Sequence, residues 1–342
     1  MADVPGASPG LARMMSEWEH VRSLVNDELN NIRNSLDVPS DLREAAFHLI
    51  SAGGKRIRPF ILMLSGGLFD VEYRESLPAA TSVELLHNFT LIHDDIMDRD
   101  EFRRGIPTTH VKFGEEVALV AGDFLFSYLH HYLVSRYSSM GKSPKLIVDI
   151  ISILSEAMNN ICVGQIMDIL PEKYINSVDD YLRMVYCKTA ALIEASACIG
   201  GMLGGCSESE LEYLRNFGKN IGMAFQIADD ILGVFGDPKV TGKPVGSDIR
   251  MGKRTLIVLF AEERMGEDER RVFRRVFGNR EASDRDVMKA IKIIEGLKVL
   301  DDVKAVMYKL KDKALSFLRK LPRSIYREHL ECLSEYIVTR QK

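Results

Sequence analysis

The sequence predicts an all-α protein, a bundle of about ten or more long helices. Apolar residues recur at intervals of three and four along most of the chain, which is the period of a helix with one buried face. Strands are not expected, because the alternation of apolar and polar residues that marks them is almost absent. No linker rich in Pro, Gly or Ser divides the middle of the chain, so we expect a single domain over residues 13–342 after a disordered tail over residues 1–12.

The composition limits the function classes. The chain has 342 residues, of which 46% are hydrophobic and 27% charged, as in ordinary soluble globular proteins. A net charge of −4 argues against a nucleic-acid partner. The five cysteines have no CxxC spacing, which indicates reduced thiols in a cytoplasmic protein. We recognise no signal peptide, and the apolar run Ala190–Gly205 is too short and too rich in glycine for a transmembrane segment.

The helices follow from this periodicity in chain order. Trp18, Val21 and Val25 begin the first apolar stripe, and Pro39 ends that stretch. Residues 286–336 read as two amphipathic helices after a loop at Gly278–Arg285. The first expected helix spans residues 14–36. Between it and the loop at Gly278, further helices are expected at residues 41–50, 60–68, 77–98, 115–137, 144–170, 178–205, 211–235 and 255–264.

A basic turn precedes the helix expected at residues 60–68. Gly53 and Gly54 let the backbone approach a ligand closely, and Lys55, Arg56 and Arg58 follow them. The start of a helix favours anions because its backbone N–H groups and its dipole both point at them. A basic surface turn is the alternative, but this combination favours a phosphate site.

Acidic residues gather at the end of an apolar helix. Asp94 and Asp98 are one turn apart and share a helix face, with Asp95 beside them. Such a cluster is often a solvated helix face, but acids that follow an apolar segment need a cation partner. Asp229 and Asp230 repeat the arrangement downstream. Carboxylate oxygens suit Mg²⁺, which takes substrate phosphates as further ligands.

Other polar residues interrupt apolar stretches. Arg103 and Arg104 follow the first acidic cluster, and a guanidinium fork matches phosphate oxygens. Asp123 falls at a buried position of its helix pattern. Lys188 is not expected to be buried without a partner. Asp168 is open to two interpretations, a buried aspartate that caps or hydrogen-bonds a neighbouring helix, or a site residue.

Several of these stretches form one ordered series of motifs, namely GGKRIRP, LIHDDIMD, RRGIPTTH, GQIMDI, KTAALIE, FQIADDILG and GKPVGSDIRMGKRT. In this order and over nearly the whole chain, the sequence resembles the trans-isoprenyl diphosphate synthases, and most closely the archaeal-type geranylgeranyl diphosphate synthases. The resemblance implies an all-helical bundle around a central cavity, a homodimer, and about three Mg²⁺ ions per active site.

The resemblance also implies a role for each motif residue. Asp94 and Asp98 would bind two Mg²⁺ ions and Asp229 a third, while Gly233 replaces the last aspartate of the second motif. Isopentenyl diphosphate would be held by Lys55, Arg58, His87 and Arg104, and the allylic diphosphate by Arg103, Lys188, Thr189, Gln226, Lys243 and Lys253, with Asp95, Asp230 and Asp248 as indirect partners of the metals.

The implied reaction joins isopentenyl diphosphate head to tail with dimethylallyl, geranyl or farnesyl diphosphate. Phe89, five residues before Asp94, resembles the aromatic stop that limits the product to geranylgeranyl diphosphate, and Thr90 is small. An ideal helix turns Phe89 about 140° away from Asp94, so Phe89 as ordinary core stays open. Three different functions also stay open, namely a farnesyl or bifunctional synthase, a silent subunit of a heteromeric synthase, and a terpene cyclase.

Overall fold

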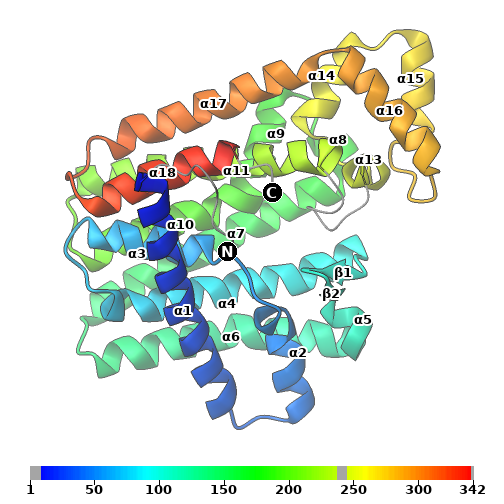
Figure 1. Ribbon diagram of the computed structural model, residues 1–342. Coiled ribbons are helices and arrows are strands. Elements are labelled where there is room, and N and C mark those ends of the chain that lie inside the picture. The colour runs from blue at the N-terminus through cyan, green and yellow to red at the C-terminus, as the bar shows by residue number, and fades with distance from the viewer. Residues whose placement is uncertain (1–8, 237–244, 340–342) are drawn as a thin grey trace. The chain divides into compact units, whose positions relative to one another are not determined.

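Helices dominate the computed structural model, which describes residues 9–236 and 245–339 (Figure 1). In the described residues, strands are limited to a short antiparallel hairpin, β1 (Phe102–Arg103) and β2 (Ile106–Pro107). The structure therefore confirms the all-α class. The chain forms two compact units, each built from segments that are distant in sequence. The single domain over residues 13–342 stays a prediction.

The first unit comprises the chain up to Ser155 together with Ala195–Leu214 and Leu321–Cys332. Its helices that lie wholly within the unit are α1 (Pro9–Ser35), α2 (Ser40–Ser51), α3 (Ile57–Gly67), α4 (Tyr73–Asp98), α5 (Thr109–Phe113) and α6 (Glu115–Ser139).

The second unit comprises Glu156–Glu194, Arg215–Lys320 and the chain from Leu333. Four helices contribute residues to both units, namely α7 (Pro144–Ile169), α10 (Ala191–Leu203), α11 (Glu208–Phe235) and α18 (Ile325–Thr339). The second unit alone contains α8 (Pro171–Tyr174), α9 (Val178–Val185), a π-helix (Tyr186–Ala190), α13 (Ser247–Met251), α14 (Leu256–Arg264), α15 (Glu267–Arg274), α16 (Asp284–Gly296) and α17 (Val299–Leu318).

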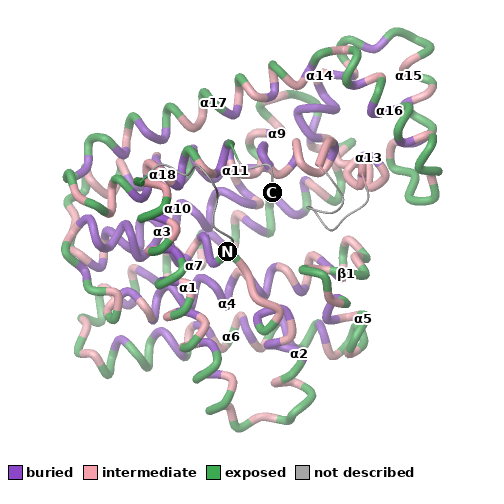
Figure 2. Tube along the Cα trace, in the orientation of Figure 1, coloured by how far each residue is buried: buried purple, intermediate pink, exposed green. Residues whose placement is uncertain are grey.

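Helix α4 is the main buried element of the first unit. It lies beside α6 and also packs against α3 (Figures 1 and 2). Apolar and small residues fill most of its length, whereas its last turn carries aspartates. The helix ends at Asp98 because Arg99 adopts the left-handed conformation. The packing thus fixes the acidic end of α4 on a rigid support.

Three expectations in the N-terminal half are wrong. Helix α1 begins at Pro9, so residues 9–12, expected in the disordered tail, are helical, and the rest of that tail lies outside the described residues. Helix α3 begins at Ile57, three residues before the start that was expected at residue 60. Asp123 is not buried: its side chain is 75% exposed, because the whole circumference of α6 carries apolar residues and the pattern does not single out one face.

The remaining differences concern where helices break. The stretch expected as one helix over residues 178–205 is interrupted by the π-helix Tyr186–Ala190 and ends at Leu203. The segment after Gly278 contains three helices, not two, because Lys298 turns left-handed between α16 and α17. Helix α15 was not expected at all.

Two helices are long and apolar enough to cross a membrane. By length and composition, α6 and α7 pass this test, which core helices of soluble proteins also pass. Helix α6 packs against α4, α2 and α5 within its unit, as a core helix does. The structure contains no membrane, and we interpret both helices as part of the helical assembly.

Candidate active site

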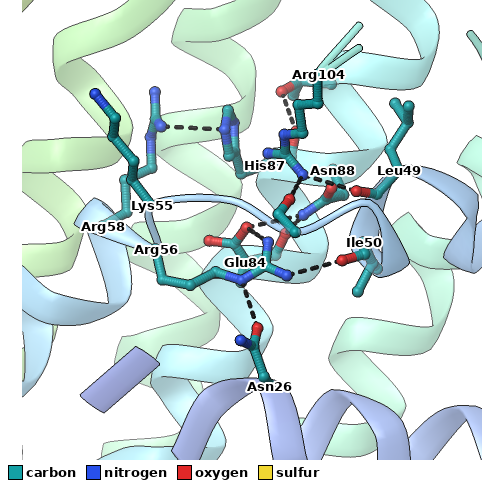
Figure 3. Close-up of polar contacts among 12 residues, drawn as sticks. Asn26, Leu49, Ile50, Lys55, Arg56, Arg58, Glu84, His87, Asn88 and Arg104 are labelled. Atoms are coloured by element: carbon teal, nitrogen blue, oxygen red, sulfur yellow. Dashed lines mark hydrogen bonds and ion pairs between the residues drawn. The ribbon is translucent and has the colours of Figure 1, made fainter. Parts of the chain in front are cut away.

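The basic turn between α2 and α3 separates its three cationic side chains. Lys55 is exposed and Arg58 half-buried, whereas Arg56 is 3% exposed. Figure 3 shows Lys55 and Arg58 extending away from Arg56, which points toward Glu84 on α4. Two of the three cations are therefore available to an anion, and the third is part of the protein interior.

His87 on α4 lies beside this turn. Its Nε2 is 3.3 Å from Nη1 of Arg58, a contact that needs a neutral ring as the acceptor (Figure 3). Burial, and then the positive charges of Arg58 and the neighbouring arginines, hold the pKa of His87 well below its usual range. A neutral histidine among arginines leaves the net charge of this region positive.

Arg104 reaches the same turn from the β-hairpin. Its Nη1 donates to the carbonyl oxygen of Leu49 at 2.7 Å and also to that of Gly53. These carbonyls belong to the end of α2 and the loop after it, where helix carbonyls lack internal partners. Lys55, Arg58, His87 and Arg104 are thus brought together in the first unit, as the sequence predicted.

The first acidic cluster occupies the last turn of α4, where the helix dipole disfavours negative charge. Asp94 and Asp98 are half-buried, while Asp95 is fully buried and accepts a hydrogen bond from Arg103 Nε at 2.5 Å. Burial raises the pKa of Asp95 to about 6, against the opposing effect of Arg103. Its second oxygen, Oδ2, is buried without a hydrogen-bond partner.

A chain of hydrogen bonds, one of them buried and two partly buried, connects Thr189, Gln226, Asp230 and Tyr181 in the second unit. Thr189 Oγ1 donates to Gln226 Oε1 at 2.7 Å, and Gln226 Nε2 donates to Asp230 Oδ1 at 2.8 Å. Tyr181 donates to the second oxygen of Asp230 at 2.6 Å. Burial, together with the nearby charge of Asp248, raises the pKa of Asp230 to about 7. Asp229, the residue before it on α11, is half-buried.

Lys188 lies on the π-helix, where an extra residue in the turn is frequently associated with a functional site. Its ammonium forms an ion pair with Asp168 of α7. Burial acts to raise the pKa of Asp168, but Lys188 and Lys253 outweigh it and the net shift is downward. The side chain of Asp168 therefore bonds to a neighbouring helix, and its assignment as a site residue stays a prediction.

Gly233 leaves space that another carboxylate fills. A Cβ atom at Gly233 would lie 2.1 Å from Oδ2 of Asp248, which follows it on α13. The missing aspartate of the second motif is thus replaced in space by the side chain of Asp248. Lys253 lies two residues after α13, and Lys243 lies outside the described residues.

The chemistry of the carboxylates fits a hard divalent cation. Three observations agree: the acids end a helix against its dipole, one buried carboxylate oxygen lacks a partner, and oxygen ligands suit Mg²⁺. Within residues 9–236 and 245–339, no three His, Cys, Asp or Glu side chains form a complete ligand set by themselves. Mg²⁺ characteristically takes waters and substrate phosphates as its further ligands.

Phe89 packs against α6 in an aromatic cluster. Its ring centroid is 4.6 Å from that of His93 and 5.1 Å from that of Phe126. Gly122 allows this approach, because a Cβ there would lie 2.3 Å from Nε2 of His93. Thr90 is buried and its hydroxyl donates to the carbonyl of His87. Phe89 therefore lies between two helices of the first unit rather than in solvent.

Comparison with known proteins identifies the family of this chain. The model of the polyprenyl synthetase family matches residues 39–294. The chain belongs to the polyprenyl synthetase family. It is a prenyltransferase of isoprenoid biosynthesis.

Curated relatives of this prenyltransferase differ in their products. A short chain isoprenyl diphosphate synthase of Methanocaldococcus jannaschii is 43% identical over 81% of this chain and 82% of its own length. A geranylfarnesyl diphosphate synthase of Aeropyrum pernix is also 43% identical, over 89% of this chain and 96% of its own.

Solved structures share the fold. The geranylgeranyl pyrophosphate synthetase of Pyrococcus horikoshii is 36% identical, covers 96% of this chain and 99% of its own, and superimposes with a TM-score of 0.87. The geranylgeranyl pyrophosphate synthase of Corynebacterium glutamicum, in complex with isoprenyl diphosphate and magnesium, is 28% identical over 95% and 98% of the chains with a TM-score of 0.83.

The structural positions of two residues were missed from the sequence. Arg56 was grouped with the phosphate-binding cations, but it is buried against Glu84. Tyr181, which holds Asp230, was not considered. No local pattern could identify either one, because both depend on a partner that is 28 or 49 residues away in the chain.

Proposed function

We propose that this prenyltransferase condenses isopentenyl diphosphate head to tail with dimethylallyl, geranyl and farnesyl diphosphates, and that geranylgeranyl diphosphate is the main product. The observation that carries the proposal is the cationic turn. The cations Lys55, Arg58 and Arg104 lie around the neutral His87 and form one group, whereas Lys188 belongs to another sequence motif and to a second group. An enzyme that used one diphosphate substrate would not need both groups.

Each group has its own substrate in this proposal. Lys55, Arg58, His87 and Arg104 bind isopentenyl diphosphate. The allylic diphosphate contacts Arg103, Lys188, Thr189, Gln226, Lys243 and Lys253. Asp94, Asp98 and Asp229 hold about three Mg²⁺ ions, with Asp95, Asp230 and Asp248 as indirect partners. Support comes from the Mg²⁺-compatible donors and from the hydrogen-bonded chain that orients Thr189 and Gln226.

The chemistry begins with heterolytic cleavage of the allylic carbon–oxygen bond, whose electron pair leaves with the diphosphate. When bound, Mg²⁺ supplies charge stabilisation for this leaving group. Lys188 and Arg103 hold the same diphosphate and stabilise the negative charge that grows on it. The double bond of isopentenyl diphosphate attacks the allylic carbon, a new carbon–carbon bond forms, and a proton passes to the released diphosphate. Apolar walls exclude the water that would quench the cation.

The product length is supported by Phe89. Its ring packs beside His93 on α4 and Phe126 on α6, which places aromatic bulk between these two helices, as a floor would require. A farnesyl or bifunctional enzyme, or one with a longer product, is distinguished by the product itself. Chromatography of the dephosphorylated products made from dimethylallyl and from farnesyl diphosphate is the test. A fifteen-carbon or a twenty-five-carbon main product would overturn the geranylgeranyl assignment.

Two different functions are distinguished by substrate dependence. A terpene cyclase releases diphosphate from the allylic substrate alone, whereas we expect release only when isopentenyl diphosphate is also present. A silent subunit of a heteromeric synthase would show no turnover alone, which the presence of Asp94, Asp98 and Asp229 argues against. We also propose that the protein is cytoplasmic.

The apolar face of α6 supports a homodimer. Val120 is 57% exposed, and Leu119 and Val134 are each 40% exposed. Phe124, one turn after Val120, is half-buried and stacks on Tyr128. Exposed apolar side chains along one long helix are typical of a surface that a partner covers. A second copy of this chain is the partner we propose.

A further inference from the structure

The most completely buried ion pair of the first unit lies directly below the isopentenyl diphosphate site proposed above. Nη1 of Arg56 donates to Oε1 of Glu84 at 2.6 Å, and their side chains are 1% and 2% exposed (Figure 3). Neither group can contact a substrate from this position. Ion pairs this dry are costly to desolvate, and a hydrophobic pair of similar volume is often as stable. The pair therefore calls for a reason beyond stability.

Arg56 connects one turn to three helices. Besides Glu84 on α4, its Nε donates to Oδ1 of Asn26 on α1 at 2.9 Å. Its Nη2 donates to the carbonyl oxygen of Ile50 on α2, also at 2.9 Å. Arg56 itself immediately precedes α3. The planar guanidinium makes these bonds in fixed directions, which an ammonium group cannot reproduce.

The backbone of the turn needs this support. Arg56 has a φ of 52°, a left-handed conformation that a residue with a side chain adopts only when its surroundings impose it. Gly53 has a φ of 93°. A Cβ atom at Gly54 would lie 3.0 Å from Nη1 of Arg56 and 3.0 Å from Nη2 of Arg104, so both guanidinium groups pack where a side chain at this position would be.

The same contacts orient the substrate-facing cations. Lys55 is the residue before Arg56, and its carbonyl accepts a hydrogen bond of 2.6 Å from Trp18 Nε1. Arg58 is two residues after Arg56, at the start of α3. Glu84 lies one turn before His87, which Arg58 contacts. Arg56 and Glu84 therefore fix both sides of the proposed diphosphate site relative to each other.

We propose that Arg56 is a positioning residue for isopentenyl diphosphate: through Glu84, Asn26 and the Ile50 carbonyl it holds the turn in the conformation that directs Lys55 and Arg58 toward the diphosphate. This inference rests on the proposed function. It assigns a role in binding one of the two substrates to three residues, Asn26, Arg56 and Glu84, that do not touch that substrate.

The first test is steady-state kinetics of the full-length Arg56→Met protein with both substrates varied. A displacement of about an ångström at a binding group can cost about 100-fold, so we expect the KM for isopentenyl diphosphate to rise by about 10- to 100-fold. The KM for the allylic substrate and kcat at saturation should change less than about threefold. A merely structural role would reduce the active fraction, and therefore the apparent kcat, and would leave both KM values unchanged.

The Glu84→Met variant distinguishes a positioning role of Arg56 from an effect of the net charge near the site. Removing a carboxylate makes the region more positive, so long-range attraction alone predicts a lower KM for isopentenyl diphosphate. Positioning predicts a higher KM, by about 10-fold or more, because Arg56 loses its anchor. Asn26→Ala removes one neutral hydrogen-bond partner of Arg56, and we expect a smaller rise in the same KM. A lower or unchanged KM in Glu84→Met would overturn the proposal.

Stability is measured on the same proteins. The double variant Arg56→Met, Glu84→Met avoids a lone buried charge and should recover the thermal stability lost in the single variants, but not the KM for isopentenyl diphosphate. Recovery of both would show that stability alone was affected. Arg215→Met, which breaks the Glu194 pair in the second unit, is the matched control and should leave this KM unchanged.

The unmodified protein separates the two hypotheses. If it releases diphosphate without isopentenyl diphosphate, the proposed function fails. If it requires isopentenyl diphosphate and the Arg56 and Glu84 variants keep its KM, the proposed function stands and the positioning role is wrong.

Discussion

Asp94 and Asp98 lie where the electrostatics of α4 are least favourable for them. The helix ends at Asp98, and its carbonyl end already carries partial negative charge. Positive charge close to these carboxylates therefore stabilises the folded chain as well as any bound diphosphate. Asp229 is placed differently: it is half-buried beside Asp230 on α11, six residues before the helix ends at Phe235.

We predict that Asp94→Ala and Asp229→Ala each lower kcat by at least about 100-fold while the proteins stay folded, because each change removes stabilisation of the leaving diphosphate. Turnover at saturating Mg²⁺ and far-ultraviolet circular dichroism are the measurements. Asp37→Ala is the control, since that aspartate is exposed between α1 and α2 and should be dispensable. Nearly full activity in either site variant would contradict the proposed metal ligands.

The side chain of Phe89 is expected to limit the length of the product. Phe89→Ala should lengthen the main product, because it removes the ring that packs on Phe126 and opens space between α4 and α6. Thr90→Phe should shorten it. Product chromatography measures both effects. Phe124→Ala serves as the control, because Phe124 stacks on Tyr128 instead. An unchanged product in Phe89→Ala would make Phe89 an ordinary core residue.

His329 provides a pH-dependent prediction. Both ring nitrogens are buried without a hydrogen-bond partner, and burial lowers the pKa of His329, although Glu17 and Glu328 act to raise it and Arg13 to lower it. The unfolded chain therefore takes up the proton more readily, so folded stability is lost as pH falls below about 6.5.

The His329→Leu variant lacks the pH-dependent contribution of His329 to the free energy of unfolding. Between pH 6.5 and 5.5 its free energy of unfolding should fall by up to about 1 kcal/mol less than that of the unmodified protein. Urea unfolding at the two pH values measures the difference. His48 and His87, whose pKa values are also lowered, remain in both proteins and cancel. Equal losses in the two proteins would refute the assignment.

Residues in contiguous motifs could be located from the sequence, while those with distant partners could not. The grouping of Lys55, Arg58, His87 and Arg104 was expected, because the family resemblance implied one shared diphosphate site for them. The interior position of Arg56 was missed, since only the fold reveals that Glu84 lies below the turn. The exposure of Asp123 was misjudged because α6 is apolar on several sides.

At the scale of elements, the π-helix Tyr186–Ala190 packs unusually closely on α7. A Cβ atom at Gly164 would lie 2.3 Å from the backbone nitrogen of Lys188 and 2.7 Å from its Cα. These are backbone atoms, so they could only yield by moving the π-helix. The position of Lys188 and Thr189 thus depends on a glycine in another helix.

We therefore predict that Gly164→Ala lowers kcat/KM for the allylic substrate by about 10- to 100-fold, by displacing Lys188. The KM for isopentenyl diphosphate should hardly change. Gly296→Ala, at a helical glycine with open space around it, is the matched control and should behave like the unmodified protein. Equal losses for both substrates would indicate general destabilisation.

The sequence predicts that helices form, but it does not predict the points at which they are interrupted. Apolar periodicity continues through Tyr186–Ala190, so the extra residue of the π-helix leaves no signal in the pattern. Lys298 likewise turns left-handed without a glycine or proline to mark the break. The start of α1 at Pro9 is consistent with the preference of proline for the first turn of a helix, although the surrounding Gly and Ala residues suggested disorder.

For the whole molecule, the exposed face of α6 leads to a prediction about assembly. Val120→Glu should convert a dimer of twice 38.6 kDa into a monomer, because the charge could not be buried in an apolar contact. Sedimentation velocity distinguishes the two masses. Met288→Glu, the same type of change at another exposed apolar residue, should not alter the mass. A monomeric unmodified protein would exclude the proposed homodimer.

The all-α class was predictable for the whole chain because periodicity is a local property, whereas the division into two units was not. Each unit combines segments that are far apart in sequence, and no linker marks the boundaries. Such contacts depend on which helix faces meet, and several helices here are apolar on more than one face.

The first unit is built from segments that are far apart in the sequence, and this has a consequence for its biosynthesis. This unit includes Leu321–Cys332, and Tyr326 in that segment packs against Gly67 and beside Tyr73. A ribosome must therefore deliver nearly all of the chain before the unit that contains the first aspartate cluster can close. Until then the nascent polypeptide exposes apolar helices such as α6, at a synthesis rate of about 5–20 residues per second. Chaperones that shield apolar segments would have many seconds in which to act on it.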